Sequence, residues 1–599
     1  MPTPSARLRA LRDQLVRERL DGFVVPLTDE HMSEYVGDYA QRLAWLTGFE
    51  GSAGTAVVLA EEAAIFTDGR YTIQVREQVS AADWSFVSVP ETNVPAWLGE
   101  HAHAGMRVGY DPWLHTRGWV EEARAALAGV GAELVALERN PIDSIWADRP
   151  APSPAPLAVH PERLAGRGAA AKRADVADWL AAAGADATVI TALDSIAWLL
   201  NLRGADVART PVALAYAVAH ADGTADLYVA PEKMTAAVAE HLGNAVRVHD
   251  RATFAASLDS LAGKRVAIDP ALAVAAIADR VERAGGTVLP LRDPTVLPRA
   301  TKNPVEVAGH RAASLRDGAA LTRFLRWVAE AAPRGGVTEL SAAERLSVFR
   351  AESGLLRDQS FDAISATGPH GAIPHYRVTP ESSLPIEPGQ LYLIDSGGQY
   401  EDGTTDVTRV VPIGSPRDEM RDRFTRVLKG HIALATATFP RGTNGGQLDS
   451  IARRPLWDAG LDYAHGTGHG VGSYLSVHEG PARIAKPSYP GGGPAEPLLP
   501  GMILSNEPGY YKAGAYGIRI ENLLLVVERE LPGGDAPMLG FDTLTLAPID
   551  RDLIDPALLT DAELTWINAY HHRVAATLAP VLGGDDAAWL EARCTRITR

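Results

Sequence analysis

Four carboxylates and one histidine in the last third of the chain could together bind metal ions. They are Asp395, Asp406, His469, Glu507 and Glu521. Carboxylate oxygens can bridge two divalent cations about 3.5–4 Å apart and hold a hydroxide between them, which is the nucleophile of two-metal hydrolases. If the five side chains converge, two cations would neutralise their negative charge, and without metal the cluster would repel itself. The residue types therefore predict a two-metal hydrolase site.

The ligand set also limits the identity of the metal. It offers carboxylate oxygens, one imidazole and no thiolate, which favours Mn²⁺, Co²⁺ or Mg²⁺, although Zn²⁺ binds such sets as well. We expect two Mn²⁺ ions. Arg519 stands two residues before Glu521 on a predicted strand, so both side chains would point to one face. The guanidinium of Arg519 could then orient a ligand carboxylate.

The segments that carry these residues are predicted to be strands and turns. In residues 391–414, two β-rich runs flank a Gly-Gly and an Asp-Gly connection. This pattern predicts that Asp395 ends one strand and that Asp406 begins its hairpin partner. Helical spacing of apolar residues predicts a long helix over residues 313–332 before them. Residues 540–582 predict a strand, a turn and a C-terminal helix, capped by Thr560 and Glu563.

The chain upstream of these segments consists of two α/β modules of similar size and order, which could be structural duplicates. Residues 5–19 predict an amphipathic first helix, followed by strands. Prolines in residues 141–156 indicate a linker, and prolines and charges near residue 300 indicate a second boundary. We therefore predict an α/β (α+β) chain. Its domains would be 1–142, 143–300 and 301–599, the last with a C-terminal extension over about 542–599.

Composition excludes several classes of protein. The 599 residues carry a net charge of −17 and no run of Lys or Arg, so a nucleic-acid partner is not expected. The single cysteine, Cys594, excludes a disulfide framework within the chain and favours a reducing compartment. The N-terminus has no apolar core of signal-peptide length, and no apolar stretch reaches membrane-spanning length. These features predict a cytoplasmic enzyme without a membrane partner.

Each candidate residue also has a simpler interpretation when taken alone. An aspartate at a hairpin, such as Asp395, usually serves the turn. His465 and His469 stand beside glycines and could be loop histidines. The glycines of this segment lack the Lys-Ser/Thr ending of a phosphate loop and the G-x-G-x-x-G spacing, so nucleotide binding is not predicted. Only the set of five ligands makes the metal site the better hypothesis.

Several motifs, in the same order along nearly the whole chain, resemble the cytosolic, three-domain form of aminopeptidase P, also called Xaa-Pro aminopeptidase. They are WLTGFEGSAGTAVV, FTDGRYTIQ, TALDSIAWLLNLRG, GAIPHYR, LIDSGGQYEDGTTDVTR, HGTGHGVGSYLSVHEGP, LSNEPGYY, GIRIENL and GFDTLTLAPID. The resemblance implies two N-terminal creatinase/prolidase-type α/β domains and a C-terminal pita-bread catalytic domain. It also implies a binuclear Mn²⁺ site and small peptide substrates that begin with Xaa-Pro. The first residue would be released by attack of a hydroxide held between the two metal ions.

The resemblance also assigns roles to individual residues. It implies the same five metal ligands, with Glu507 also shuttling a proton. His375 and His478 would steady the substrate and the oxyanion, and His465 would line the proline pocket. Arg70 is carried over as a substrate contact, and a homodimer is expected. One departure is the Gly- and Pro-rich segment 486–501, which is longer than the usual connection and predicts a surface loop.

Two alternatives remain open from the sequence. Prolidase has the same five ligands but cleaves Xaa-Pro dipeptides, and it usually lacks this three-module length. Some pita-bread proteins have lost their metals and act as binding modules, a reading that the complete ligand set disfavours.

Overall fold

The computed structural model describes residues 2–89, 91–488 and 493–599. These residues form two compact units, Met1–Arg299 and Ala300–Arg599, which we describe separately. Within the described ranges, no helix combines the length and apolar character needed to cross a bilayer. Residues 489–492 of the predicted surface loop lie outside the described residues.

The N-terminal unit holds two mixed sheets, the first with strand order β4-β3-β2-β1-β5-β6. In this sheet β1 pairs with β2 and β2 with β3 in antiparallel fashion, whereas β3–β4, β1–β5 and β5–β6 are parallel. The strands are β1 (Gly22–Pro26), β2 (Thr55–Leu59), β3 (Ala63–Thr67), β4 (Ser85–Ser88), β5 (Arg107–Tyr110) and β6 (Glu133–Ala136).

Both faces of the first sheet are buried, which explains the unbroken apolar run of β1. Successive strand residues point to opposite faces, so Phe23 and Val25 enter one core and Val24 enters another. Helices α1 (Pro4–Glu18) and α6 (Pro141–Ile145) supply apolar residues to the first core. Helices α4 (Val94–His101) and α5 (Arg117–Gly129) supply them to the second. Helix α1 confirms the amphipathic helix predicted over residues 5–19.

The second sheet repeats the strand order and strand directions of the first. Its order is β12-β11-β10-β8-β13-β14, with β8–β10 and β10–β11 antiparallel and the other pairs parallel. The two modules are therefore structural duplicates, as their sequences suggested. The strands are β8 (Ala187–Ile190), β10 (Ala215–His220), β11 (Ala225–Val229), β12 (Val246–Asp250), β13 (Arg265–Ile268) and β14 (Thr287–Pro290). The main helices are α8 (Ala169–Ala183), α9 (Leu193–Leu200), α10 (Ala236–Leu242), α11 (Phe254–Ser257) and α12 (Ala275–Arg283).

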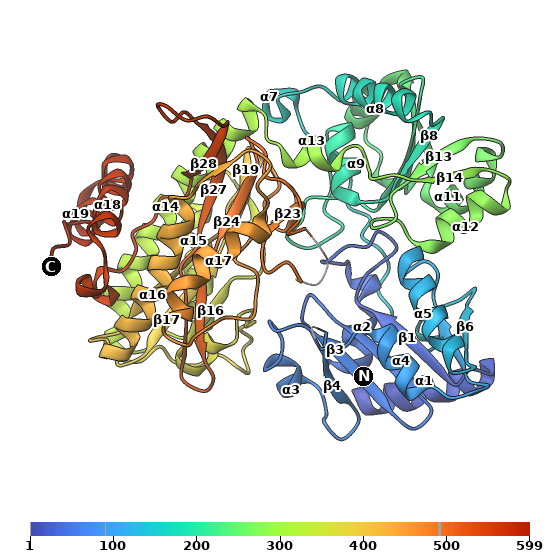
Figure 1. The fold of residues 1–599 in the computed structure, drawn as a ribbon, viewed down its shortest axis with the longest axis horizontal. Helices are drawn as coiled ribbons and strands as arrows, with labels where there is room; N and C mark the ends of the chain where they lie inside the picture. The colour runs from blue at the N-terminus through green and yellow to red at the C-terminus, as the bar shows by residue number, and fades with distance from the viewer. Residues whose placement is uncertain (1, 90, 489–492) are drawn as a thin grey trace. The chain divides into compact units, whose positions relative to one another are not determined.

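In the C-terminal unit, four helices precede or lie among the strands that carry the candidate ligands (Figure 1). The helices are α14 (Pro304–Ala331), α15 (Glu339–Ala351), α16 (Asp418–Ala435) and α17 (Gly445–Trp457). Helix α14 packs on strand β17 through Leu321 and Phe324, which share a core with Tyr392 and Ile394. This packing holds β17 rigidly, because cores of this kind are close-packed.

Two sheets of this unit matter for the site. The three-stranded sheet has the order β16-β17-β20, and the six-stranded sheet has the order β21-β28-β27-β24-β22-β23. The strands of the first are β16 (Ile364–Thr367), β17 (Leu391–Ser396) and β20 (Val407–Pro412). Those of the second are β21 (Thr438–Pro440), β28 (Met538–Thr543), β27 (Asn522–Arg529), β24 (Ile503–Asn506), β22 (Gly468–Gly470) and β23 (Glu479–Ile484). The remaining strands are β15 (Leu356–Gln359), β18 (Gly398–Tyr400) and β19 (Gly403–Thr404) in one small sheet, and β25 (Gly509–Lys512) and β26 (Tyr516–Arg519) in a hairpin.

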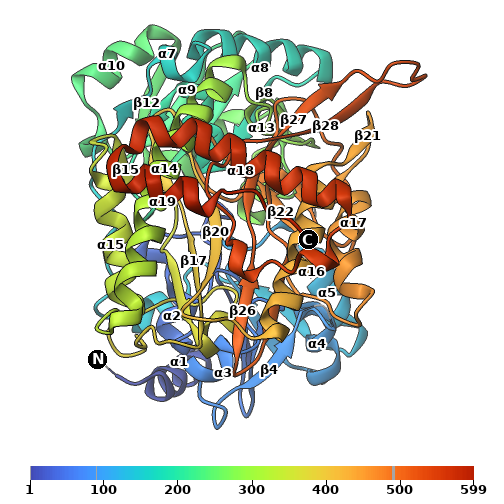
Figure 2. The same ribbon diagram turned by 90° about the vertical axis from the view of Figure 1, so that its left-hand side faces the viewer.

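Two helices end the chain, α18 (Asp561–Leu582) and α19 (Gly584–Arg593), drawn in red in Figure 2. Helix α18 begins with the predicted capping box, since Thr560 accepts from the backbone of Glu563 and the Glu563 side chain accepts in return. Both helices contact α14.

The structure corrects three local predictions. Helix α14 begins at Pro304, with a capping box between Asn303 and Glu306, and not at residue 313. Proline is favourable at the first helical position, so the prolines that indicated only a boundary also start the helix. Strands β17 and β20 pair as predicted, but β18 and β19 lie between them in the chain and join another sheet. Arg519 ends β26 and Glu521 precedes β27, so the two do not share a strand.

A buried ion pair links α14 and α15. Arg350 donates to Asp317 from Nε at 2.7 Å and from Nη2 at 3.0 Å. Tyr400 donates to the same carboxylate at 3.0 Å. The side chains of Arg350 and Asp317 are 1% and 4% exposed. Each charge therefore depends on the other for compensation.

We expect Arg350→Met to lower the unfolding free energy of the C-terminal unit by about 3–5 kcal/mol, because it leaves Asp317 as a buried charge without its partner. Hydrogen exchange of the α14 and α15 amides under native conditions measures this loss. The matched control is Arg441→Met, which breaks an exposed pair with Glu528 and should cost at most about 1 kcal/mol. An equal loss of unfolding free energy in the two variants would show that Arg350 does not compensate a buried charge on Asp317.

Candidate metal centre

Asp395 and Asp406 lie at neighbouring strand ends in the three-stranded sheet. Asp395 is the next-to-last residue of β17 and pairs with Thr408 of β20. Asp406 directly precedes β20. Both carboxylates are buried. The two carboxylates therefore lie at the same end of the sheet, as the predicted strand pair implied.

The other three ligand candidates lie on adjacent strands of the six-stranded sheet. His469 is in β22, Glu507 follows β24 and Glu521 precedes β27. Strands β24 and β27 pair at Asn506 and Asn522, so Glu507 and Glu521 extend from the same end of the pair. The backbone of His469 donates to Ser505 Oγ at 3.0 Å.

A glycine allows His469 to approach β24 so closely. A Cβ atom at Gly468 would lie only 2.0 Å from the carbonyl oxygen of Ser505. Any side chain at this position would push β22 away from β24 and displace the imidazole. Gly470 has a similar role, since a Cβ atom there would lie 2.3 Å from the carbonyl oxygen of Glu479, so both glycines serve close packing of strands.

The structure brings the candidate ligands from both sheets together. Ligand atoms of Asp406, His469 and Glu521 all lie within 4.8 Å of one another. The Nε2 atom of His469 is 3.5 Å from carboxylate oxygens of both Asp406 and Glu507. Asp395 lies close enough to raise the pKa values of three carboxyl groups, those of Asp406, Glu507 and Glu521.

The cluster is electrostatically unfavourable without cations. Burial raises the pKa of Asp406 well above its ordinary value, and the charges of Asp395 and Glu507 raise it further. Burial and the charges of Asp406 and Asp395 do the same for Glu521. Burial raises the pKa of Glu507 to about 7, against the attraction of Arg519. Protons would partly neutralise this cluster, and divalent cations could neutralise it while keeping the carboxylates ionised.

The donor set fits metal ions. Oδ1 of Asp395 is buried and finds no hydrogen-bond partner among the described residues. A buried carboxylate oxygen without a donor is costly, and a cation would satisfy it. Four carboxylates and one imidazole, all converging, match the hard-ligand sets that hold Mn²⁺ and related ions.

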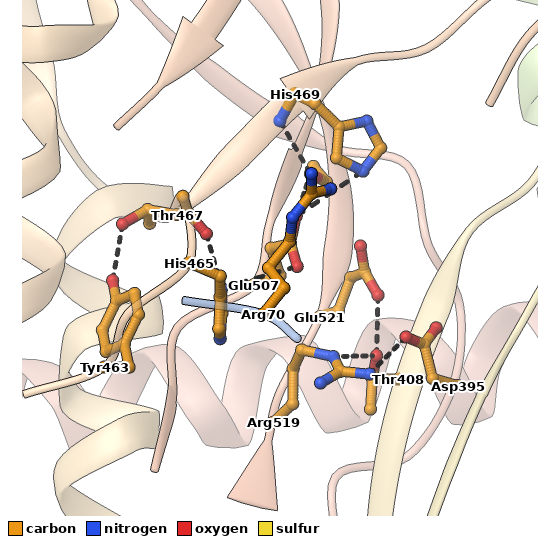
Figure 3. A network of polar contacts seen from close by, with 12 residues as sticks. Arg70, Asp395, Thr408, Tyr463, His465, Thr467, His469, Glu507, Arg519 and Glu521 are labelled. Atoms are coloured by element: carbon orange, nitrogen blue, oxygen red, sulfur yellow. Dashed lines mark hydrogen bonds and ion pairs between the residues drawn. The ribbon is translucent and has the colours of Figure 1, made fainter. Parts of the chain in front are cut away.

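Arg519 connects the ligands to one another (Figure 3). Its Nη2 donates to Asp395 Oδ2 at 2.5 Å and its Nε donates to Thr408 Oγ1 at 3.2 Å. The hydroxyl of Thr408 donates in turn to Glu521 Oε2 at 2.7 Å. Arg519 thus holds the carboxylate of Asp395, a candidate metal ligand, and it does so from a strand separate from that of Glu521.

A hydrogen-bond chain continues from Arg519 to His465. Arg519 Nη1 donates to the Tyr511 hydroxyl at 2.7 Å, which is 2.7 Å from Nε2 of His465. The tyrosine can donate its own proton to Nε2, and the neutral imidazole then carries its proton on Nδ1, which faces the Gly466 carbonyl at 2.7 Å. His465 is therefore fixed in orientation. Its Nδ1 is 4.0 Å from Glu507.

Helix α17 supports the loop on which His465 lies. Arg453 donates to Asp449 at 2.6 Å and to the His465 carbonyl at 2.7 Å. Thr467 donates to Asp449 at 2.6 Å and is 2.5 Å from the Tyr463 hydroxyl. These contacts fix the loop at both His465 and Thr467.

Sequence reasoning did not find Thr408, Tyr511, Asp449 or Arg453. Thr408 could have been found from the hairpin, since it faces Asp395 across the strand pair. Tyr511 and the α17 residues carry no spacing signal, because they meet the site only through tertiary contacts.

His478 and His375 are held in different ways. The His478 ring packs edge-on against His469, with ring centroids 4.2 Å apart. His375 lies in a loop that the buried Glu339 organises. Glu339 accepts from the Thr367 backbone at 2.7 Å, from the Tyr376 hydroxyl at 3.0 Å and from the Leu384 backbone at 2.9 Å. His375 directly precedes Tyr376 in the chain, so the hydrogen bond from Tyr376 to Glu339 restrains the backbone of His375.

Arg70 belongs to the N-terminal unit. Its guanidinium donates to both oxygens of Asp68, at 2.8 Å to Oδ2, and is 3.4 Å from Glu34. The local bond between Asp68 and Arg70, which the sequence offered as the simpler interpretation, is therefore present.

Comparison with known families places these observations in context. Residues 308–528 match metallopeptidase family M24, and residues 537–597 match the C-terminal region of that family. Residues 7–144 and 148–306 each match a creatinase/prolidase N-terminal domain. Fold and site together define a pita-bread metallopeptidase with two creatinase-type domains before the catalytic one.

Relatives narrow the assignment within this class. The chain is 40% identical to aminopeptidase P2 of Arabidopsis thaliana, over 95% of this chain and 85% of the relative. It is 40% identical to a probable Xaa-Pro aminopeptidase P of Aspergillus clavatus, over 99% of this chain and 93% of the relative. The crystal structure of an X-prolyl aminopeptidase from Caenorhabditis elegans, described as a cytosolic enzyme with a di-nuclear active site, matches over 100% of both chains with a TM-score of 0.95 and 34% identity. The chain belongs to the aminopeptidase P family, as its motifs predicted.

A more distant likeness concerns the fold alone. A prolidase from Thermococcus sibiricus matches 63% of this chain and 97% of its own, with a TM-score of 0.51 and 21% identity.

The raised pKa of Glu507 generates a prediction about pH. Folded, metal-free protein keeps this carboxyl protonated up to about pH 7, whereas the unfolded chain releases the proton near 4.5. The folded state binds more protons in this window, so its stability falls as pH rises through it. We expect chelated Glu507→Gln protein to become more stable than chelated wild type as pH rises from about 5 to about 8, by roughly 3 kcal/mol.

Urea unfolding of both chelated proteins across this pH range measures the difference. Glu528→Gln, at an exposed carboxylate in the same unit, is the matched control and should follow wild type. A difference between Glu507→Gln and wild type that does not change with pH would show that the cluster does not hold this proton.

Proposed function

We propose that this chain is a metal-dependent aminopeptidase that releases the N-terminal residue from peptides with proline in the second position. The observation that carries the proposal is the convergence of four carboxylates, three of them buried and Glu507 half-buried, with one buried histidine from two sheets. Similarity to Xaa-Pro aminopeptidases over nearly the full length of the chain supports the same substrate class.

The proposed metal ligands are Asp395, Asp406, His469, Glu507 and Glu521. They would hold two divalent cations, for which we propose Mn²⁺, with Co²⁺ or Zn²⁺ as alternatives. Such cations, when bound, lower the pKa of water and polarise a carbonyl group. Arg519 and Thr408 would keep two of the ligands in position through the hydrogen bonds described above.

Proline in the second position imposes a special demand. The bond before it is a tertiary amide without an N–H, so extended-strand recognition loses one donor. The ring must instead be recognised by shape and apolar contact. We propose that His465, fixed by Tyr511, lines the pocket for this ring and that Arg70 is a further substrate contact.

Two steps of peptide hydrolysis need residues of the protein. Negative charge develops on the carbonyl oxygen, and an imidazole N–H of His478 or His375 would donate a hydrogen bond to it. The proline nitrogen must then gain a proton before it leaves. Glu507 would deliver this proton as a general acid.

Further proposals concern the whole protein. We propose domain boundaries near residues 142 and 300, and a homodimer as the assembly. The second boundary agrees with the division of the chain into compact units at residues 299 and 300. A cytoplasmic location is proposed from the single cysteine and from the cytosolic description of the Caenorhabditis elegans enzyme.

The first test is release of the first residue from an Xaa-Pro-Xaa tripeptide and from an Xaa-Pro dipeptide. We expect chelation to abolish release from the tripeptide and Mn²⁺ to restore it, because the buried carboxylates need cations to act. Cleavage of the dipeptide alone would favour the prolidase alternative. No cleavage of either peptide, with two metals present by elemental analysis, would favour a binding module.

The second test concerns the proton shuttle. Glu507→Gln keeps an oxygen ligand but cannot carry a proton, so we expect turnover to fall by about 10²–10⁴-fold. The measurement is kcat for the tripeptide together with metal content, and Glu528→Gln is the control that should retain wild-type turnover. Normal turnover with two metals bound would contradict the proposed role of Glu507.

A further inference from the structure

A second pocket lies within the N-terminal unit, at the junction of its two α/β modules. Its volume is about 260 Å³. The first module contributes residues from loops after β1 and β5, among them Glu30 and Asp111. The second module contributes Tyr216 from β10 and Phe254 from α11. None of the metal-ligand candidates lines it.

The topology of the first sheet favours a binding site at this place. Strands β1 and β5 are parallel neighbours, and the chain leaves β1 toward β2 on one side while β5 lies on the other. In open α/β sheets, ligands bind outside the carboxyl ends of strands at such a reversal of strand order. The segment with Glu30 follows β1, and Asp111 directly follows β5.

The pocket carries charges of both signs. Three arginines, Arg42, Arg149 and Arg251, lie among its walls beside Glu30 and Asp111. Arg251 Nη2 donates to Glu30 Oε1 at 2.5 Å, and the Tyr39 hydroxyl donates to the same oxygen at 2.9 Å. A simple anion would be repelled by the carboxylates, and a simple cation by the guanidinium groups.

The arginines keep hydrogen-bonding capacity that the protein does not use. Nη1 of Arg42 and Nε of Arg251 are buried and have no hydrogen-bond partner in the described part of the chain. Arg149 uses Nε for the Tyr39 carbonyl and Nη1 for Asp143, and its side chain is 26% exposed. Buried donors without acceptors are uncommon in native proteins, and a ligand carboxylate is the acceptor that guanidinium groups fit best.

Aromatic rings form the remaining walls. Tyr216 and Phe254 are stacked with centroids 3.8 Å apart, and the Arg251 guanidinium lies 5.3 Å from the Tyr216 ring centre. Tyr39 and Trp113 also line the pocket. These rings suit an apolar side chain, and their faces attract an ammonium group.

We propose that this pocket binds a small zwitterion, a free amino acid or dipeptide with an apolar side chain. The arginines would receive its carboxylate, Glu30 its ammonium group, and the rings its side chain. The volume lies just below the range of about 300–1,000 Å³ typical of drug-sized ligands, which fits a molecule of this size. The ligand would touch both modules and so stabilise their junction. This proposal does not depend on the proposed peptidase activity.

The test uses full-length, chelated protein and four probes: L-phenylalanine, L-leucine, N-acetyl-L-phenylalanine and L-phenylalaninamide. The last two each lack one charge of the zwitterion. Calorimetric titration measures affinity, and hydrogen exchange locates the protected segments. We expect both amino acids to bind, each single-charge analogue to bind at least about tenfold more weakly, and protection at residues 36–45 and 249–257.

Two variants and one control make the test specific. Arg149→Gln removes a guanidinium and should weaken L-phenylalanine binding at least about tenfold. Ala255→Trp fills the pocket from a half-buried helix position and should abolish binding. Arg9→Gln, at an exposed arginine of the same unit, should bind as wild type does. Thermal unfolding checks that each variant is folded.

Several outcomes would overturn the proposal. One is the absence of binding of either amino acid at about 10 mM, a concentration at which a Kd of about 1 mM would be detected. Another is binding of both single-charge analogues as tight as that of L-phenylalanine. A third is binding that neither Arg149→Gln nor Ala255→Trp changes. Protection confined to segments other than the two named would equally exclude this pocket as the site.

Discussion

The burial of like charges around one point is the constraint on which the catalytic unit depends. Asp406, Glu507 and Glu521 are held close together, Asp406 and Glu521 buried and Glu507 half-buried, and burial and mutual repulsion raise their pKa values. Such an arrangement persists only if the backbone holds the carboxylates in place and cations or protons offset their charge. Strand ends meet the first need, because paired strands fix the direction of each side chain. Metal ions meet the second without removing the ionised carboxylates.

Hydrogen bonds connect the candidate ligands to residues farther from the cluster. Arg519 joins Asp395 to Tyr511, and Tyr511 joins it to His465, so one network links a metal ligand to the proposed proline pocket. If Asp395 binds a metal and His465 lines the proline pocket, as proposed, a single guanidinium couples the two sites. The five proposed ligands alone would not separate an aminopeptidase from a prolidase, since the resemblance implies the same set for both. Under the proposed function, discrimination would come from groups such as His465, which is proposed to contact the substrate and not the cations.

The N-terminal unit shows how one topology can support different surroundings. Its two sheets have the same strand order and directions, yet the loops that follow equivalent strands differ in sequence. In the first module these loops bring Glu30 and Asp111 to the junction with the second, where Arg251 and Tyr216 complete a polar and aromatic pocket. Loops tolerate change better than the strands that position them, so a duplicated fold can form a pocket where the loops of its two copies meet.

The sequence by itself determined the kinds of residue and the local elements. It predicted the pairing of the strands around Asp395 and Asp406, the first helix and the cap at Thr560, because hydrophobic period, turn chemistry and capping act over a few residues. It also singled out the five candidate ligands by residue type. Only the tertiary structure decided that His469 approaches Ser505 across a glycine, that Arg519 reaches Asp395 from a separate strand, and that Tyr511 and helix α17 fix His465. These contacts join residues far apart in the chain, and their geometry follows from sheet pairing and side-chain packing, which no local pattern encodes.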